Sequence, residues 1–326
     1  MRLIRRILVA VKDPAARSQP AVTKAAQLAK ALGAKLELFH AITTPVMAEL
    51  YGTGEGGAKD LERRAGAEVC KRLDIIAERL RGPGAKISVA AEWDYPAYEA
   101  IVRRAKRVKA DLVVAERHAG RHIAPWFLHL NDWELLRLCP VPVLLTKNSG
   151  AYRHPVVLAA VDPTHFAKPA KLDEAILATG QTIAHALRGT LHAVHAHPSV
   201  LSGTRAIDAF SPQRAAEMNA RFAVAAMRQL DRLLQSTKIP RSRRHLNGSP
   251  PVEAIQQVAR ATHCSIVVMG ALSRSGLKRV FIGNTAESLL DHLTCDVLIV
   301  KPTHFANRVP ASRRGARVIA LTPAIP

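Results

Sequence analysis

Short apolar runs alternate along the chain with longer amphipathic segments. The runs are rich in β-branched residues and nearly continuous in hydrophobicity, which is typical of parallel strands buried on both faces. In the first half they are Ile7–Val11, Leu36–His40, Leu112–Ala115 and Val143–Leu145. The segments between them carry apolar residues at helical spacing, with Arg and Lys on the other face. They are Pro20–Leu32, Leu61–Arg81 and Tyr98–Val108.

The second half of the chain repeats the first. Glu99-Ala100-Ile101 precedes a strand at 110–114, and Glu253-Ala254-Ile255 precedes one at 264–268, at the same offset of 154 residues. Arg6–Pro14 matches Pro155–Pro163 at an offset of 149, and Leu36–Ala41 matches Leu191–Ala196 at an offset of 155. Such drift is what loop insertions between two copies of one unit produce.

Strands 143–147 and 297–301 close the two copies, and residues 148–153 read as a linker. We therefore expect one domain at 1–149, a second at 154–302 and a basic tail at 303–326. Alternating strands and helices predict an α/β fold with two tandem open parallel five-stranded sheets. The copies are expected to pack as an intramolecular pseudo-dimer, since duplication supplies both sides of a twofold-like interface. A homodimer beyond that stays open.

Charge is the unusual bulk property. The 326 residues carry 47 Lys and Arg against 26 Asp and Glu, a net charge of +21. The excess is dispersed over both halves and aromatic residues are only 4%, so the charge favours a solvated basic surface over a dedicated nucleic-acid face. No apolar run approaches the ~20 residues of a membrane span, and the start lacks a signal-like apolar region. The expected location is the cytoplasm.

Cysteines and histidines offer weak chemistry. Cys70, Cys139, Cys264 and Cys295 are far apart with no CxxC, which predicts free buried thiols. His192, His195 and His197 lie close together. On a strand His195 and His197 point to one face and His192 to the other, which breaks a three-ligand metal cluster.

In a doubly wound sheet the ligand lies outside the carboxyl ends of the strands. Asp-Pro follows the first strand of both copies, at Asp13-Pro14 and Asp162-Pro163. Each carboxylate either contacts a ligand or starts a turn. After the fourth strand the copies diverge, because Glu116 stands in the first where Gly270 stands in the second. A carboxylate there would repel phosphate, so the first copy is expected to have lost its seat.

The loop after Gly270 predicts an anion seat in the second copy. Small residues at Gly270, Ser273 and Gly276 let the backbone curve around a ligand, and Arg274 supplies charge. Gly283 leads into Asn284-Thr285, with Asn284 as the N-cap of the next helix. Free N–H groups at that helix start could hold a phosphate, and a plain tight loop is the alternative.

These residues resemble the tandem universal stress proteins over about 4–302, through two V-x-V-D-P-like openings and a G-x2-S-x9-G-N-T-A-E segment. The resemblance implies a Rossmann-like fold of the adenine nucleotide alpha hydrolase type. It implies that ATP or a related nucleotide is bound by the second copy, with Asp162 on the nucleoside and His195 beside the base. ATP-binding members carry G-x2-G-x9-G-[S/T]; here Ser273 replaces the middle glycine and Asn284 the hydroxyl residue.

Three functions stay open at this stage. The first is a stress-response protein regulated by a nucleotide or another small anionic ligand, with at most slow ATP hydrolysis, because no Mg²⁺ carboxylate pair or catalytic base is evident. The second is an interaction protein that binds other stress-response proteins without a ligand. The third is a basic protein associated with nucleic acid, in which the tail could act as a tether. A need for metal is left open.

Overall fold

The computed structural model describes residues 4–44, 46–47, 55–117, 127–164, 169–197, 211–271, 289–290, 292–302, 305–315 and 318–319. Contacts divide the chain into two compact units. One contains Ile4–Ala151 together with Ala306–Pro326, and we call it the N-terminal domain. The other contains Tyr152–Phe305, and we call it the C-terminal domain. The expected tandem of α/β halves is thus present.

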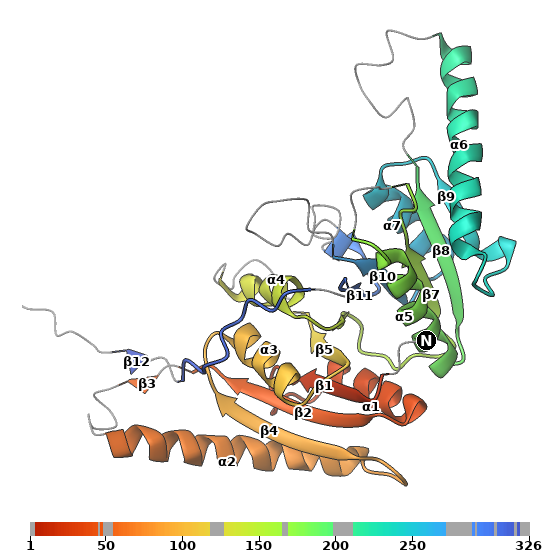
Figure 1. Ribbon diagram of the computed structural model, residues 1–326. Coiled ribbons are helices and arrows are strands. Elements are labelled where there is room, and N and C mark those ends of the chain that lie inside the picture. Colours follow the sequence, from red (N-terminus) through yellow and green to blue (C-terminus); the bar gives the residue numbers. More distant parts are fainter. Residues whose placement is uncertain are drawn as a thin grey trace, which may run out of the picture. The chain divides into compact units, whose positions relative to one another are not determined.

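The N-terminal domain contains a parallel sheet with strand order β4-β2-β1-β5-β6. Its strands are β1 (Arg6–Ala10), β2 (Lys35–Ile42), β4 (Ile87–Trp93), β5 (Leu112–Glu116) and β6 (Val143–Thr146). The helices are α1 (Pro20–Leu32), α2 (Glu55–Leu80), α3 (Ala97–Arg107) and α4 (Phe127–Leu138). Figure 1 shows α2 running along β4 at the edge of this sheet. Two short strands, β3 (Val46–Met47) and β12 (Val318–Ile319), pair in parallel.

The C-terminal domain repeats this plan with strand order β11-β10-β7-β8-β9. Its strands are β7 (Val156–Ala160), β8 (Thr190–Ala196), β9 (Arg244–Asn247), β10 (Ile266–Gly270) and β11 (Asp296–Val300). The helices are α5 (Leu172–Ala186), α6 (Pro212–Leu234) and α7 (Pro251–Ala261), with a 3-10 turn, η4 (Arg241–Arg243), before β9. In both domains the first strand is central, so the chain order reverses beside it and creates a switch point.

The central strands are buried on both faces, as their continuous hydrophobicity predicts. Leu8, Val9 and Val114 of the N-terminal domain are 0% exposed, as are Leu158 and Val267 of the C-terminal domain. Parallel strands covered by helices on both sides have no solvent-facing side, so they need apolar residues at successive positions.

The strand registers correct the offset of the first repeat match. Ile7 pairs with Leu36 on β2, and Val157 pairs with Leu191 on β8. Leu36 and Leu191 are equivalent, so Ile7 corresponds to Val157, an offset of 150 (157 minus 7) and not 149. In a strand buried on both faces a one-residue slip leaves the apolar pattern intact, so the sequence alone does not fix the register.

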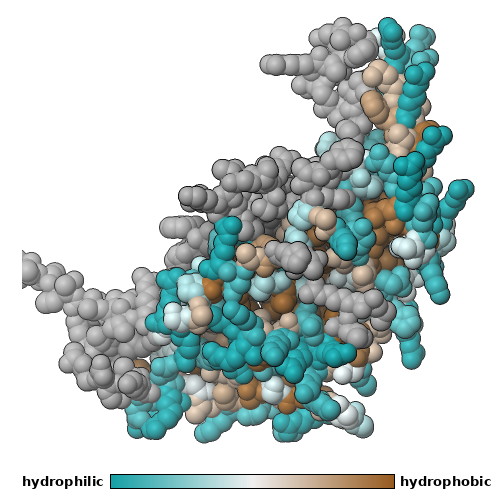
Figure 2. Space-filling view, viewed as in Figure 1, coloured by the Kyte–Doolittle hydropathy of each residue, from teal (hydrophilic) through white to brown (hydrophobic). Residues whose placement is uncertain are grey.

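Two helices leave large apolar side chains exposed: α2 exposes Ile75, and α6 exposes Phe222 and Val224. Phe222 is 49% and Val224 53% exposed, and hydrophobic residues lie among hydrophilic ones along α6 in Figure 2. The visible face of the N-terminal domain is by contrast mostly hydrophilic, in keeping with the dispersed charge. No helix among the described residues is long and apolar enough to cross a bilayer.

The described part of the basic tail contacts the N-terminal domain. Residues 309–314 pack on the N-terminal domain, where Val309 is 7% exposed and Arg313 and Arg314 pair with carboxylates. Figure 1 shows the tail, in dark blue, running past α3 toward β12. The sequence showed the arginines but not their partners, since the acids that hold them lie more than 200 residues earlier in the chain.

Candidate functional site

The carboxyl ends of β7, β8 and β10 lie together at one edge of the C-terminal sheet. Val268 on β10 pairs with Ala159 on β7, and Ala160 pairs with Val194 on β8. The residues that follow these positions are Gly270, Asp162 and His195. Three of the predicted site residues are therefore brought to the edge where open α/β sheets hold ligands.

Asp162 stands directly after the last buried residue of this strand segment, Val161. One of its carboxylate oxygens accepts the Thr164 hydroxyl at 2.7 Å and the Thr164 backbone N–H at 3.3 Å. The side chain is 50% exposed. Asp162 thus starts a turn, and half of its surface still faces solvent, so the two roles weighed from the sequence are compatible at this position.

The register shift means that Asp13 is not the counterpart of Asp162. With Ile7 equivalent to Val157, the residue matching Asp162 is Lys12. Asp13 lies one position later, and its carboxylate accepts the Ala15 backbone N–H at 2.8 Å. The Asp-Pro pair therefore occurs in both domains but not in the same place.

His195 lies beneath Asp162 and is fully buried, at 0% exposed. Its Nδ1 is 3.2 Å from the Val161 carbonyl oxygen and 3.8 Å from a carboxylate oxygen of Asp162. Burial lowers the pKa of His195 against the opposing pull of Asp162, so the ring is neutral near pH 7. Because a carbonyl only accepts, the neutral ring carries its proton on Nδ1. Nε2 is left as a buried acceptor with no hydrogen-bond partner among the described residues.

The N-terminal domain repeats the histidine contact. His40 Nδ1 lies 2.8 Å from the Val11 carbonyl oxygen, and burial likewise lowers the pKa of His40. Val11 and Val161 occupy equivalent positions under the corrected register. The bond between the second strand and the end of the first is thus shared by both domains, and it has a structural role whether or not a ligand binds.

Gly270 is required by packing. A Cβ built on Gly270 would lie 2.7 Å from Leu172 Cδ2, 3.0 Å from Leu172 Cγ and 3.2 Å from Ile176 Cδ1. The first turn of α5 therefore occupies the space that a side chain would need. In the N-terminal domain Glu116 takes the equivalent place at the end of β5, as the sequence repeat predicts.

The other residues predicted to form the anion seat lie outside the described residues. They are Ser273, Arg274, Gly276, Gly283, Asn284 and Thr285. Their role as a phosphate seat stays a prediction.

Sequence reasoning missed two residues at this edge. Asp173, in the first turn of α5 and 3% exposed, accepts the Asp162 backbone N–H at 3.3 Å. Thr164 holds the Asp162 carboxylate. Asp173 follows a loop of uninformative composition, and no periodicity in the sequence relates it to the end of β7. Thr164, two residues after Asp162, could have been found as a local Asx-turn partner.

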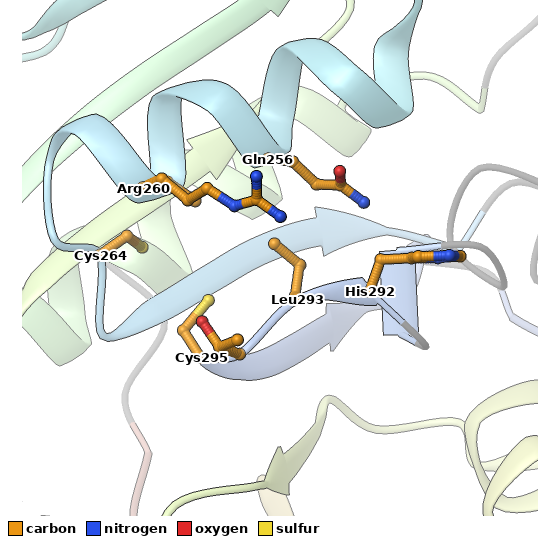
Figure 3. A pocket seen from close by; sticks show the side chains of 8 residues that line it. Gln256, Arg260, Cys264, His292, Leu293 and Cys295 are labelled. Atoms are coloured by element: carbon orange, nitrogen blue, oxygen red, sulfur yellow. The ribbon is translucent and has the colours of Figure 1, made fainter.

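A small cavity lies at the opposite, amino edge of β10 and β11. Figure 3 shows it lined by Gln256, Arg260, Cys264, His292, Leu293 and Cys295. Its volume of about 30 Å³ has room for about one water. A hydrogen bond with Cys295, followed by burial, raises the pKa of the Cys264 thiol well above its usual value. None of the four cysteines forms a disulfide in the described part of the chain, and the Cys264 thiol is a weak nucleophile at neutral pH.

His192 faces away from His195 and stacks on His245 of β9. The ring centroids are 5.3 Å apart, and Nδ1 of His192 is 3.0 Å from Nε2 of His245. Burial, then His245 and Arg243, lower the pKa of His192 to about 4. Within the described ranges no group of three or more His, Cys, Asp or Glu side chains is placed to hold a metal ion.

Comparison with known proteins identifies the fold. The model of the universal stress protein family matches residues 3–147 and again 155–301, which together cover most of the chain. The chain belongs to the universal stress protein family. The tandem of two such domains predicted from the sequence is confirmed, and so is the family's role in stress response as the broad setting of its function.

Relatives within the universal stress protein family share the tandem form. Universal stress protein E of Salmonella typhi is 28% identical over 320 residues, which is 95% of this chain and 98% of the relative. The crystal structure of a putative universal stress protein from Pseudomonas aeruginosa UCBPP-PA14 is 25% identical, with a TM-score of 0.68 over 92% of this chain and 94% of that one. A structure from Archaeoglobus fulgidus DSM 4304 is 16% identical with a TM-score of 0.58, covering 91% and 96%.

Proposed function

We propose that the C-terminal domain binds ATP, a related nucleotide or another small anionic ligand at the carboxyl ends of β7 and β10, and that the protein acts by ligand occupancy and not by turnover. The single observation that carries this proposal is the Asp162 carboxylate. It is held at the switch point by Thr164 with half of its surface open to solvent. A carboxylate in that place can accept hydrogen bonds from a ribose or a base edge.

The surroundings of Asp162 support a ligand of this kind. Nε2 of His195, close to Asp162, accepts no hydrogen bond from the residues that the structure describes. Since buried acceptors are almost always satisfied, a bound molecule or a water with an N–H or O–H donor would complete it. The predicted phosphate seat at Ser273, Gly276, Gly283, Asn284 and Thr285 follows Gly270 in the sequence, with Arg274 as its charge.

The residues of the N-terminal domain support the proposal that only the C-terminal domain binds the ligand. Glu116 ends β5 where Gly270 ends β10. A carboxylate at an anion seat repels phosphate by about 1 kcal/mol or more at close range. Lys12 stands at the register position of Asp162, and the carboxylate of the next residue, Asp13, accepts the Ala15 backbone N–H. We therefore expect one ligand for each chain.

Calorimetric titration with ATP tests the proposal on the full chain. Asp162→Asn removes the carboxylate, and we expect about ten-fold weaker binding, the size of one charge-assisted hydrogen bond. Asp13→Asn is the matched control and should bind as the wild type does. Gly283→Glu places a carboxylate at the predicted seat and should abolish binding. Equal affinity of the wild type and Gly283→Glu would remove the seat.

An interaction protein that uses no ligand is the second candidate. The observation that favours it is the docking of the tail on the N-terminal domain, which gives that domain a protein segment as its partner. Absence of any thermal shift with ATP, AMP or sugar nucleotides would favour this function. A cytoplasmic location, other stress-response proteins as partners and a homodimer or pseudo-dimer arrangement stay predictions.

A further inference from the structure

The tail residues Arg313 and Arg314 sit in an acidic cleft of the N-terminal domain. Arg314 binds Glu99 through two hydrogen bonds, Nη2 to Oε1 at 2.7 Å and Nε to Oε2 at 2.9 Å. Arg313 Nη2 donates to Glu62 at 2.6 Å and to the Trp93 carbonyl at 2.9 Å. Two parallel N–H donors on one carboxylate are the geometry that distinguishes arginine from lysine.

The cleft also recognises the backbone of the tail. The Arg314 N–H donates to Asp94 Oδ1 at 3.0 Å, and Arg103 Nη1 donates to the Pro310 carbonyl at 3.3 Å. Farther along the tail, β12 pairs in parallel with β3 of the same domain. The segment is thus held in one register by side chains and main chain together.

The acids of the cleft are built into the domain. Asp94 is 0% and Glu99 4% exposed, and Arg103 is held between them. Burial alone raises the pKa of Glu99, but hydrogen bonds from Arg314 and Arg103 outweigh it and the pKa is lowered. The carboxylate is therefore ionised, and part of what keeps it so is an arginine from the tail.

Counting the charges of this ion-pair network shows what the tail supplies. Five carboxylates take part, and the domain provides three arginines for them, Arg103, Arg104 and Arg107. The acids are Glu37, Glu62, Glu92, Asp94 and Glu99. Arg313 and Arg314 bring the number of cations to five. Without the tail the network has two uncompensated negative charges, partly buried, which is unfavourable.

A cavity of about 400 Å³ opens beside Arg313, lined by Glu62, Arg63, Gly66, Ala91, Glu92 and Trp93. Arg313 itself is 39% exposed and Arg314 58% exposed. The guanidinium groups are therefore bound at the mouth of the cleft, where solvent reaches them.

We propose that this acidic cleft is a recognition site for an extended protein segment with two consecutive arginines, and that residues 309–314 are its resident, releasable ligand. The carboxyl edge of the N-terminal domain thus binds a basic peptide. The tail competes from within the same chain, at an effective concentration in the mM range for a short tether.

A peptide with the sequence of residues 306–319, labelled with a fluorophore, tests the site in trans on the full chain. R313E/R314E ejects the chain's own tail by repulsion from Glu99 and Asp94 and leaves the cleft free. Anisotropy titration should then show peptide binding at least about ten-fold tighter than to the wild type, whose cleft is filled. K71E/R79E reverses the same number of exposed charges on α2 and should bind like the wild type.

Two further arms make the result specific. Glu99→Gln in the R313E/R314E background should remove the gain, and a peptide with glutamine at both arginine positions should not bind. Folded R313E/R314E that binds no more tightly than the wild type overturns the proposal. If that variant does not fold, Arg314→Lys carries the test, since it keeps the charge but loses the paired donors. A gain of about three-fold supports the site and no gain overturns it.

Discussion

At the scale of single residues, burial decides which histidines stay neutral. His192, His195 and His245 in the C-terminal domain and His40 in the N-terminal domain all have lowered pKa values, with burial as the largest cause. The His192–His245 stack requires that at least one ring be neutral to accept the hydrogen bond between them. Protonation of both rings at acid pH would therefore break this hydrogen bond between β8 and β9, at the edge of the C-terminal sheet.

This arrangement predicts acid-sensitive stability. The pKa of His192 is about 4 in the folded chain and 6.5 when unfolded, so unfolding takes up a proton between these values. The stabilisation is complete above pH 6.5 and is lost as the pH falls toward 4. Urea unfolding at pH 7.5, 6 and 5 should show the decline. His192→Gln/His245→Gln should make the decline smaller, since His195 and His40 still contribute to it. His263→Asn, which replaces a histidine outside the stack, should leave the decline as in the wild type. An unchanged slope in the double variant would contradict the assignment.

The difference between Asp13 and Asp162 also belongs to this scale. A shared Asp-Pro pair suggested equivalent sites, but the strand register moves one of them by a residue. The sequence could show the dipeptide in both copies. It could not show the register, because consecutive apolar residues fit both alignments of a buried strand.

At the scale of elements, helix α5 shapes the proposed site. Leu172 and Ile176 in its first two turns fill the space beside Gly270, and Asp173 holds the Asp162 backbone. Gly270 was expected to leave space for a ligand, but the space beside it is filled by side chains of α5. The same helix fixes the backbone on which the ligand contact depends.

Gly270→Ala should therefore destabilise the C-terminal domain. The added methyl would lie 2.7 Å from Leu172 Cδ2, and such overpacking costs about 1–3 kcal/mol. Gly66→Ala in α2 is the matched control, since nothing lies within 4 Å of its added methyl. It should stabilise its helix by about 0.5–1 kcal/mol. Denaturant unfolding measures both, and a neutral Gly270→Ala would show that α5 yields more than its packing suggests.

Most elements were predictable because their signals are local. Four strands and three helices of the first half follow from apolar runs and helical spacing, although α2 begins at Glu55 and not at Leu61, and β4 was not among the expected ranges. The Glu116 and Gly270 equivalence was found from the repeat. Three contacts could not be predicted, because each joins residues that only folding brings together. They are Asp173 with the Asp162 backbone, Gly270 with Leu172, and the tail arginines with their carboxylates. The phosphate seat formed by six residues between Ser273 and Thr285 stays a prediction, because these residues lie outside the described ranges.

At the scale of the whole molecule, the chain returns to its first domain after completing the second. Residues beyond Phe305 belong with Ile4–Ala151. Two arginines of this tail, Arg313 and Arg314, pair with carboxylates of the N-terminal domain. Their pairing weakens the hypothesis that the tail serves as a nucleic-acid tether.

Trypsin at pH 8 can report on this docking. Glu99→Gln removes the carboxylate that binds Arg314, so cleavage after Arg313 and Arg314 should become several-fold faster, at about the scale of one lost charge-assisted bond. Glu78→Gln, on the exposed face of α2, should leave the rate unchanged. Equal cleavage in the wild type and Glu99→Gln would mean that the tail is held by other contacts.

The central claim is that the C-terminal domain binds the ligand and the N-terminal domain does not. Hydrogen–deuterium exchange of the full chain with and without ATP tests it most directly. We predict slower exchange at 161–164 and in the segment after Gly270, with no change at the corresponding 11–14 and after Glu116. Protection in the N-terminal domain, in both domains, or nowhere at saturating ATP would contradict the account.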